Sequence, residues 1–266
     1  MEVAGSGNDE RNMNYYWRLF ATGFSFFTFG VGGLIVGLLL FPLVNLVFWQ
    51  PERRTAVGQY LIHKLFRFFV EMMCFLGIME YDIKGLEKLQ NAQGTLIVAN
   101  HPTLIDVVIL IAFLPKVDCV VKQALRKNPV MIGPVAAANY IVNADPERLI
   151  EDCSERLQSG NALIVFPEGT RSIPGKPYKF QRGAAGIALR AGVKMTPVCI
   201  SCVPSTLTKA EKWYQIPARK FFVTLNVRDA IDVNDVIASD MPKSKAARHL
   251  TKYLQDYFMK EIPPHG

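Results

Sequence analysis

The longest apolar segment of the chain lies near its N-terminus. From Leu19 to Trp49 there are 31 residues without a charged side chain, which indicates a membrane segment. As one straight helix it would be about 46 Å long, whereas the hydrocarbon core of a bilayer is about 30 Å thick. Gly30, Gly32 and Gly33 divide the segment into two shorter halves. One tilted span and a re-entrant pair of helices therefore both fit the pattern.

Polar residues 1–18 precede this segment, and we expect them to form a loose leader. The leader is slightly acidic and no small-residue cleavage site follows the apolar run, so a secretory signal peptide is not expected. Pro51 ends the apolar segment. If the segment spans a membrane, the basic side that begins at Arg53 should be cytoplasmic.

A second helix is predicted from Thr55 to Gly77. Its apolar stripe at helical spacing consists of Leu61, Leu65, Phe68, Phe69 and Met72. The positive charge of this region comes from Arg53, Arg54, His63, Lys64 and Arg67. A basic amphipathic helix beside an apolar anchor is typical of a helix that lies in the membrane interface. A core helix of the following domain is the alternative.

From Tyr81 onward, short apolar runs alternate with helical patterns. The predicted strands are Tyr81–Lys84, Leu96–Ala99, Asp118–Val121, Tyr140–Asn143, Ala162–Phe166, Met195–Ser201 and Phe221–Val227. The predicted helices between them are Leu104–Phe113, Pro129–Ala138, Pro146–Gln158, Ala184–Arg190 and Lys243–Met259. This alternation favours an α/β fold with a mixed, largely parallel sheet flanked by helices. We therefore divide the chain into residues 1–78, with leader, apolar membrane anchor and interfacial helix, and an α/β domain over residues 79–266.

Composition and charge also point to a membrane surface. Half of the 266 residues are hydrophobic, which is high for a soluble domain of this size. The net charge is +7, and since residues 1–50 sum to −1, the rest of the chain carries +8. A basic body behind an apolar N-terminus suits an anionic membrane. Nucleic acid is not an expected partner, because we find no zinc finger, RNP motif or Arg-rich arm.

The five cysteines do not suggest a disulfide framework. Their number is odd and they are scattered, mostly through apolar runs. Cys199 and Cys202 have the CxxC spacing, but they lie inside a predicted strand, where residues i and i+3 face opposite sides. We expect two buried thiols and a reducing, cytoplasmic setting for the body of the protein.

Candidate chemistry begins where the apolar run Thr95–Ala99 ends. Pro102 cannot continue a strand, so the chain must turn at His101. Thr103 is expected to be the N-cap of the helix that follows. The Asp106 carboxylate, in the first helical turn, can then reach back to the His101 imidazole and form a carboxylate-oriented base.

The same residues also fit a purely structural role. Thr103 and Asp106 have the spacing of a capping box, in which the carboxylate only holds the start of the helix. A histidine beside a proline is commonly a turn residue. These residues alone leave the two interpretations open.

A second polar stretch, residues 167–172, follows the apolar run Ala162–Phe166. Ligands of α/β sheets collect at the carboxyl ends of strands, so both polar stretches are expected to border one site. Gly169 allows a close backbone approach, and Thr170 adds a hydroxyl. Arg171 offers a planar fork suited to a phosphate or carboxylate. Alone, this stretch also fits a turn with a structural Glu–Arg pair.

Together the two stretches resemble the motifs of the glycerophospholipid acyltransferase superfamily, in particular the bacterial 1-acyl-glycerol-3-phosphate acyltransferase type. The resemblance rests on Asn-His-x4-Asp at residues 100–106 and Phe-Pro-Glu-Gly-Thr-Arg-Ser at residues 166–172. It covers roughly residues 80–230, and an N-terminal apolar anchor is also typical. It implies an enzyme of phospholipid biosynthesis that moves a fatty acyl group from acyl-CoA or acyl-carrier protein to a hydroxyl of a lysophospholipid.

The resemblance also implies roles for single residues. His101 would be the general base, and Asp106 would orient it. The residues expected to bind or shape the site of the acceptor's polar head are Glu168, Gly169, Thr170 and Arg171. Neither a metal nor a cofactor is expected, and the acyl thioester is a substrate.

One position departs from the pattern of the family. Members with glycerol-phosphate acceptors usually carry an Arg just after the strand that corresponds to residues 140–142, where this chain has Asn143. The nearest Arg is Arg148, and Lys122 is a candidate substitute for the missing charge. The acceptor is therefore expected to be something other than ordinary lysophosphatidic acid, either another lysophospholipid or a specialised lipid.

Two other functions share some of these features. A metal-dependent lipid hydrolase would use His101, Asp106 and Glu168 as ligands, but the remaining histidines are in unsupportive contexts. A non-catalytic lipid-binding protein would explain the basic amphipathic helices but not the two motifs together. For the acyltransferase we expect membrane lipids and the acyl donor as partners, and a location at the cytoplasmic face of the bacterial inner membrane.

Overall fold

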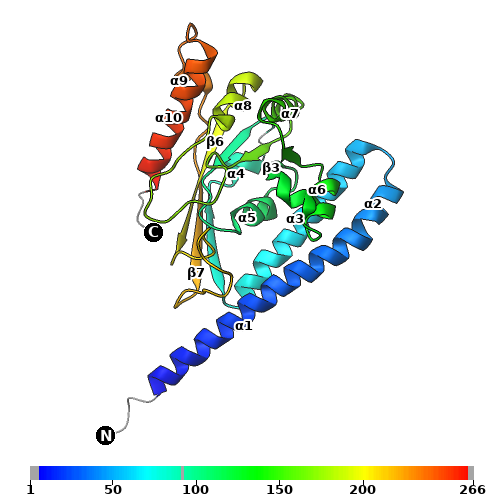
Figure 1. The fold of residues 1–266 in the computed structure, drawn as a ribbon, viewed down its shortest axis with the longest axis vertical. Coiled ribbons are helices and arrows are strands. Elements are labelled where there is room, and N and C mark those ends of the chain that lie inside the picture. The colour runs from blue at the N-terminus through cyan, green and yellow to red at the C-terminus, as the bar shows by residue number, and fades with distance from the viewer. Residues whose placement is uncertain (1–5, 91–92, 263–266) are drawn as a thin grey trace.

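The computed structural model describes residues 6–90 and 93–262 and shows a seven-stranded sheet between two layers of helices (Figure 1). The strands are β1 (Met79–Lys84), β2 (Leu96–Ala99), β3 (Asp118–Lys122), β4 (Ile141–Asn143), β5 (Leu163–Val165), β6 (Met195–Val203) and β7 (Phe221–Val227). Their order is β1-β7-β6-β2-β5-β3-β4, and only the β6–β7 pair is antiparallel. The predicted mixed, largely parallel α/β fold is confirmed.

The central strand β2 is covered on both faces. All four of its residues are fully buried. Ile97 and Ala99 pack into the core on one face, and Leu96 and Val98 pack into the core on the other. A strand buried on both faces is an unbroken apolar run in the sequence, which is why β2 has the bounds that were predicted.

The two layers of helices come from different parts of the chain. The first layer contains α1 (Ser6–Ile35), α2 (Phe41–Val47), α3 (Pro51–Phe75), α5 (Asp106–Phe113) and α6 (Ile132–Ala137). The second contains α7 (Pro146–Gln158), α8 (Gly183–Ala191) and α10 (Lys243–Glu261). Three short elements lie in the connections: α4 (Glu87–Gln90), the 3-10 turn η2 (Gln123–Lys127) and α9 (Val233–Val236). Figure 1 shows α10 on the opposite side of the sheet from α1 and α3.

The N-terminal apolar segment forms one long helical rod. α1 continues through all three glycines to Ile35, a π-helical turn (η1) covers Val36–Leu40, and α2 continues to Val47. The helical stretch Met13–Val47 is long and apolar enough to cross a membrane, and only 11% of its most apolar window is buried. Such low burial distinguishes it from a core helix of a soluble domain. A pair of helices broken at the glycines is not what the structure shows.

The expectation of a loose leader is wrong where the structure describes this region. α1 begins at Ser6, so residues 6–18 belong to the helix, while residues 1–5 lie outside the described part of the chain. The segment contains neither proline nor a β-branched residue, so no strong helix breaker stops the helix from extending. Trp17 Nε1 donates to the Leu76 carbonyl at 3.0 Å and holds the helix against the body.

α3 returns along α1 and packs one face against the domain. The Phe29 ring of α1 contacts the Phe66 ring of α3 at a tilt and the Phe69 ring edge-on, at ring distances of 6.1 and 5.1 Å. Ile62 and Phe69 are buried in the same core as Ile97 of β2. On this side α3 is a core helix, so the division between residues 1–78 and 79–266 stays a prediction.

The apolar stripe predicted for α3 is turned relative to the face that is buried. Phe68 is exposed, and Leu61 and Leu65 are only half-buried. Exposed Lys64 lies on the side away from the core. The outward face is therefore both apolar and basic, as an interfacial helix would require.

Two glycines set how closely the first layer packs. A Cβ atom on Gly58 would lie 2.3 Å from the carbonyl oxygen of Ala137, and one on Gly133 would lie 2.6 Å from the Cα of Gly37. Real Cβ atoms do not come so close to backbone. The missing side chains thus let α3 and η1 dock on α6.

Candidate active site

Asn100 fixes the end of β2 and sets where the turn at His101 begins. Its side chain is fully buried. Asn100 Nδ2 donates to the Ile200 carbonyl at 2.8 Å, and the Ile200 N–H donates to Asn100 Oδ1 at 2.7 Å. The side chain thereby pairs with β6 where the backbone of β2 has stopped. Asn100 had no predicted role, although it stands in the matched motif.

His101 and Asp106 meet as predicted. His101 Nδ1 lies 2.8 Å from Asp106 Oδ2, and Asp106 is fully buried. A carboxylate can only accept, so Nδ1 carries the hydrogen in this pair. Nε2 then has the lone pair, and it has no hydrogen-bond partner among the described residues.

Asp106 also organises the turn that precedes α5. The Thr103 N–H donates to Asp106 Oδ2 at 2.7 Å, and the Thr103 hydroxyl donates to Oδ1 at 2.6 Å. The N-cap of α5 is Ile105, so the prediction of Thr103 as N-cap is wrong. The structural and the histidine-orienting roles of Asp106 were alternatives in the sequence, and here one carboxylate makes both sets of contacts.

Glu168 joins the second loop to the first. Its Oε1 accepts the His101 backbone N–H at 3.0 Å and the Ser172 hydroxyl at 2.9 Å. The Ser172 N–H donates to the His101 carbonyl at 2.7 Å. The two loops are thus hydrogen-bonded to each other at His101. The predicted contact of Glu168 with the acceptor's head stays a prediction.

Arg171 hydrogen-bonds the loop of residues 167–172 to the connection between β6 and β7. Its Nη1 donates to the carbonyls of Leu207 at 2.9 Å and Thr208 at 2.8 Å. Leu207 has a φ of 54°, in the left-handed region that costs a non-glycine residue about 1–2 kcal/mol. Its carbonyl also accepts the Leu104 N–H at 3.1 Å. These contacts leave the other guanidinium nitrogens of Arg171 without a partner among the described residues.

A cavity of about 500 Å³ opens between the two loops. His101 lies in its wall, stacked on Phe166 at a ring distance of 4.4 Å. Gly169, Thr170 and Arg171 also line it. Most of the remaining wall is apolar, with Leu104, Val107, Val120, Val121, Leu125, Leu149, Val165 and Ile187. The cavity therefore offers an imidazole beside both polar and apolar surface.

Comparison with known proteins matches this site and fold. The family model described as Acyltransferase matches residues 80–201, which include both loops. The chain is 27% identical over 184 residues to 1-acyl-sn-glycerol-3-phosphate acyltransferase beta from Homo sapiens, covering 65% of this chain and 64% of that protein. It is 26% identical over 236 residues to the putative 1-acyl-sn-glycerol-3-phosphate acyltransferase acl-2 from Caenorhabditis elegans, covering 86% and 77%.

A solved structure has the same fold. The crystal structure of the 1-acyl-sn-glycerophosphate (LPA) acyltransferase PlsC from Thermotoga maritima matches with a TM-score of 0.66 and 22% identity, covering 90% of this chain and 96% of that one. The chain is therefore similar to acyltransferases over residues 80–201 and shares the fold of PlsC. It spans a little under two thirds of the human relative's length.

The cations of this candidate site differ partly from those expected. Lys122 lines the cavity, next to Asn143, its register partner across β3 and β4. Arg148 is exposed and is not among the lining residues. Lys209 does line the cavity and had not been singled out. The signal in the sequence is that residues 203–219 form a long polar and aromatic connection between two strands, and such connections often carry site residues.

Burial raises the pKa of Asp106 and of Glu168 above their usual values. Hydrogen bonds from His101 and Thr103 oppose the rise at Asp106, and those from the His101 N–H and Ser172 oppose it at Glu168. A desolvated carboxylate is costly to ionise unless donors surround it. These hydrogen bonds therefore favour the charged form of both acids against the effect of burial.

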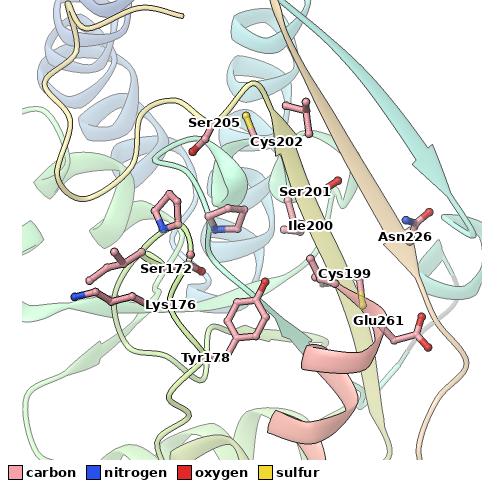
Figure 2. Close-up of a pocket in the computed structure, with 16 residues that line it drawn as sticks. Ser172, Lys176, Tyr178, Cys199, Ile200, Ser201, Cys202, Ser205, Asn226 and Glu261 are labelled. Carbon is pink, nitrogen blue, oxygen red and sulfur yellow. The ribbon is translucent and has the colours of Figure 1, made fainter. Parts of the chain in front are cut away.

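A second cavity of about 290 Å³ lies beside residues 172–178 (Figure 2). Tyr178, Cys199 and Glu261 border it, and burial raises the pKa of Tyr178 to about 12. Cys199 and Cys202 belong to different faces of the sheet, as their strand spacing predicted. No predicted site residue lines this cavity. Among the described residues no group of three or more His, Cys, Asp or Glu could hold a metal ion.

Proposed function

We propose that this chain is a membrane-associated O-acyltransferase. It moves a fatty acyl group from an acyl thioester, acyl-CoA or acyl-carrier protein, to a hydroxyl of a lysophospholipid. The observation that carries this proposal is the His101–Asp106 pair in the wall of a cavity that is both basic and apolar. The names of the relatives, all 1-acyl-sn-glycerol-3-phosphate acyltransferases, support the same reaction class.

The reaction follows from the protonation state of His101. Nε2 takes the proton of the acceptor hydroxyl as its oxygen attacks the thioester carbonyl. The imidazolium that forms is stabilised by Asp106 at Nδ1. Collapse of the tetrahedral intermediate expels the thiolate, which receives the proton from His101. The acyl group ends in an ester, the donor leaves as a thiol, and no covalent acyl-enzyme is needed.

The acceptor is an anionic lysophospholipid in this proposal. Lys122, Arg171 and Lys209 all line the cavity, and none of them forms an ion pair among the described residues. Three cations around one cavity favour a phosphate-bearing head group. Lys122 and Lys209 supply positive charge in place of the Arg that family members carry at the position of Asn143.

The N-terminal helix would hold the enzyme at the membrane where such acceptors reside. Met13–Val47 is exposed and apolar along most of its length. Arg53 and Lys64 of α3 are exposed and basic. By the positive-inside rule this favours the cytoplasmic face, which for a bacterial protein is that of the inner membrane.

The test is acyl transfer by the purified full chain in detergent. Labelled acyl-CoA or acyl-carrier protein is mixed with lysophosphatidic acid or a lipid extract, and both the thiol released and the acylated lipid are measured. His101→Ala should lower the rate by at least about 10²-fold while the protein stays folded. A folded His101→Ala protein that retains the wild-type rate would remove the mechanism. Lipid binding without thiol release would favour a non-catalytic lipid-binding protein, and loss of turnover in chelator would favour a metal-dependent hydrolase.

A further inference from the structure

The connection between β6 and β7 is fixed to the anchor helix at two points. Arg18 of α1 is buried, and its Nη2 donates to the Ala218 carbonyl at 2.7 Å. The Trp213 ring packs on Phe26 at 6.1 Å, and a Cβ on Gly23 would lie only 3.3 Å from it. These contacts join segments almost 200 residues apart in the chain. In Figure 1 the connection lies where α1 passes the end of β7.

The same connection reaches the candidate active site. Arg171 and the Leu104 N–H both bind the Leu207 carbonyl. The Thr208 N–H donates to Glu211 Oε2 at 3.0 Å, which shapes the start of the connection. Lys209 lies in the wall of the cavity. The short stretch from Lys209 to Trp213 therefore separates the cavity from the anchor helix.

The outward side of this connection is aromatic and basic. Trp213 and Tyr214 are 48% and 45% exposed. Lys212 Nζ lies 5.6 Å above the Tyr214 ring, and Lys212 and Arg219 form no ion pair among the described residues. Trp and Tyr concentrate at the level of lipid head groups, and basic residues add attraction to anionic lipids.

α1 carries an exposed aromatic surface of its own. Exposed aromatic side chains follow one side of the helix at helical spacing: Trp17, Phe20, Phe24 and Phe27. Trp17 contacts Phe20 and Phe20 contacts Phe24, at ring distances of 6.0 and 6.4 Å. Trp213 packs on Phe26, which lies on another side of the same helix. An exposed apolar surface of this extent marks an interaction site.

We propose that residues 212–219 form a second membrane-contact segment, which binds the head-group region of an anionic phospholipid bilayer beside α1. Together the two contacts fix the tilt of the domain and bring the cavity bordered by Lys209 to the lipid surface. A lipid surface is favoured over a second protein chain by the exposed Trp213–Tyr214 pair and by the positive charges of Lys212 and Arg219, which have no ion-pair partner among the described residues. The membrane contact does not depend on the proposed function, but its expected effect on turnover rests on that function.

The depth of Trp213 tests the contact directly. In the full chain with Trp17→Phe and Trp49→Phe, Trp213 is the remaining tryptophan. Reconstitution into phosphatidylcholine–phosphatidylglycerol vesicles that contain brominated lipid should quench its fluorescence. The matched control adds Trp213→Phe and Tyr253→Trp, which moves the probe to an exposed position on α10 at the far side of the sheet. The control should not be quenched. Equal quenching of both probes, or of neither, would overturn the proposal. It would also be overturned if Trp213 is shielded from the brominated lipid by a second copy of the chain.

The charge contribution is tested with Lys212→Glu and Arg219→Glu, which leave the packing of Trp213 on Phe26 in place. Each substitution should weaken quenching and lower turnover of a vesicle-embedded acceptor by about fivefold or more on anionic vesicles. Turnover of the same acceptor in detergent micelles should stay at the wild-type level. An equal loss in micelles and vesicles would refute the membrane contact. A wild-type protein inactive in both media would refute the proposed function instead, and the quenching result would still stand.

Discussion

Glu168 and His101 meet through the histidine backbone and not through its ring. Glu168 Oε1 accepts the His101 N–H at 3.0 Å, while the ring is held by Asp106 at 2.8 Å on the other side of the turn. His101 is thus held from two directions by two acids, of which Asp106 is fully buried and Glu168 half-buried. Because Glu168 is absent from the wall of the cavity, its contacts within the described residues make it a positioning residue for His101.

Asp106→Asn should leave the fold in place and lower kcat by about 10²–10⁴-fold. The amide can still accept from Thr103 at one oxygen, but it cannot stabilise the imidazolium of His101. Steady-state kinetics and circular dichroism measure the two effects separately. A kcat within a few-fold of wild type, with normal folding, would mean that Asp106 serves the turn alone.

Glu168→Gln should flatten the pH dependence of stability. Burial raises the pKa of Glu168 above its ordinary value of 4.5. Between the ordinary and the raised pKa the folded protein holds a proton that the unfolded chain has released, so stability falls as pH rises through this window. Glutamine keeps an acceptor for His101 and Ser172 but has no proton to lose.

Urea unfolding of Glu168→Gln across this pH window gives the slope directly, with Asp106 supplying a remaining slope of the same sign. Glu168→Ala is the contrasting variant. It leaves the His101 N–H and the Ser172 hydroxyl without their acceptor and should cost about 1–3 kcal/mol. Identical slopes in wild type and Glu168→Gln would show that Glu168 does not titrate in this range.

Arg171→Ala should raise the KM for the acceptor and loosen the β6–β7 connection. The carbonyls of Leu207 and Thr208 lose their shared donor, and Leu207 loses a contact that holds it at a φ of 54°. Arg171→Lys should restore charge but not the fork. Separate KM values for donor and acceptor, with limited proteolysis of the connection, distinguish the two roles. A rise in the thioester KM alone would remove Arg171 from the head-group site.

The sequence predicted all seven strands, because most of them are short apolar runs, and β1 alternates apolar and polar residues. β2 and β7 have the predicted bounds residue by residue. The start of α5 was predicted two residues too early. The Thr103 hydroxyl donates to the Asp106 carboxylate and accepts the Ile105 N–H at 3.3 Å, but the helix itself begins only at Asp106. Residue spacing does not show where in this turn the helix starts.

The candidate site was predictable where its chemistry is local and not where it depends on distant segments. His101 and Asp106 are five residues apart, so spacing was enough to pair them. The bond from Glu168 to the His101 backbone, and the place of Lys209 in the cavity, depend on which strands are neighbours. The sequence shows the strands but not their order in the sheet.

Gly58→Ala should separate the anchor helices from the domain. The new Cβ would lie 2.3 Å from the Ala137 carbonyl oxygen, which is backbone of α6 and cannot swing away. The overpacking should cost about 1–3 kcal/mol and displace α3 from its core contacts. Gly30→Ala on α1 is the matched control, since its Cβ would meet nothing within 4 Å. Thermal unfolding in detergent should show a lower Tm for Gly58→Ala and an unchanged or higher Tm for Gly30→Ala, because alanine favours a helix over glycine. Equal Tm values for the two variants would show that α3 does not need its close approach to α6.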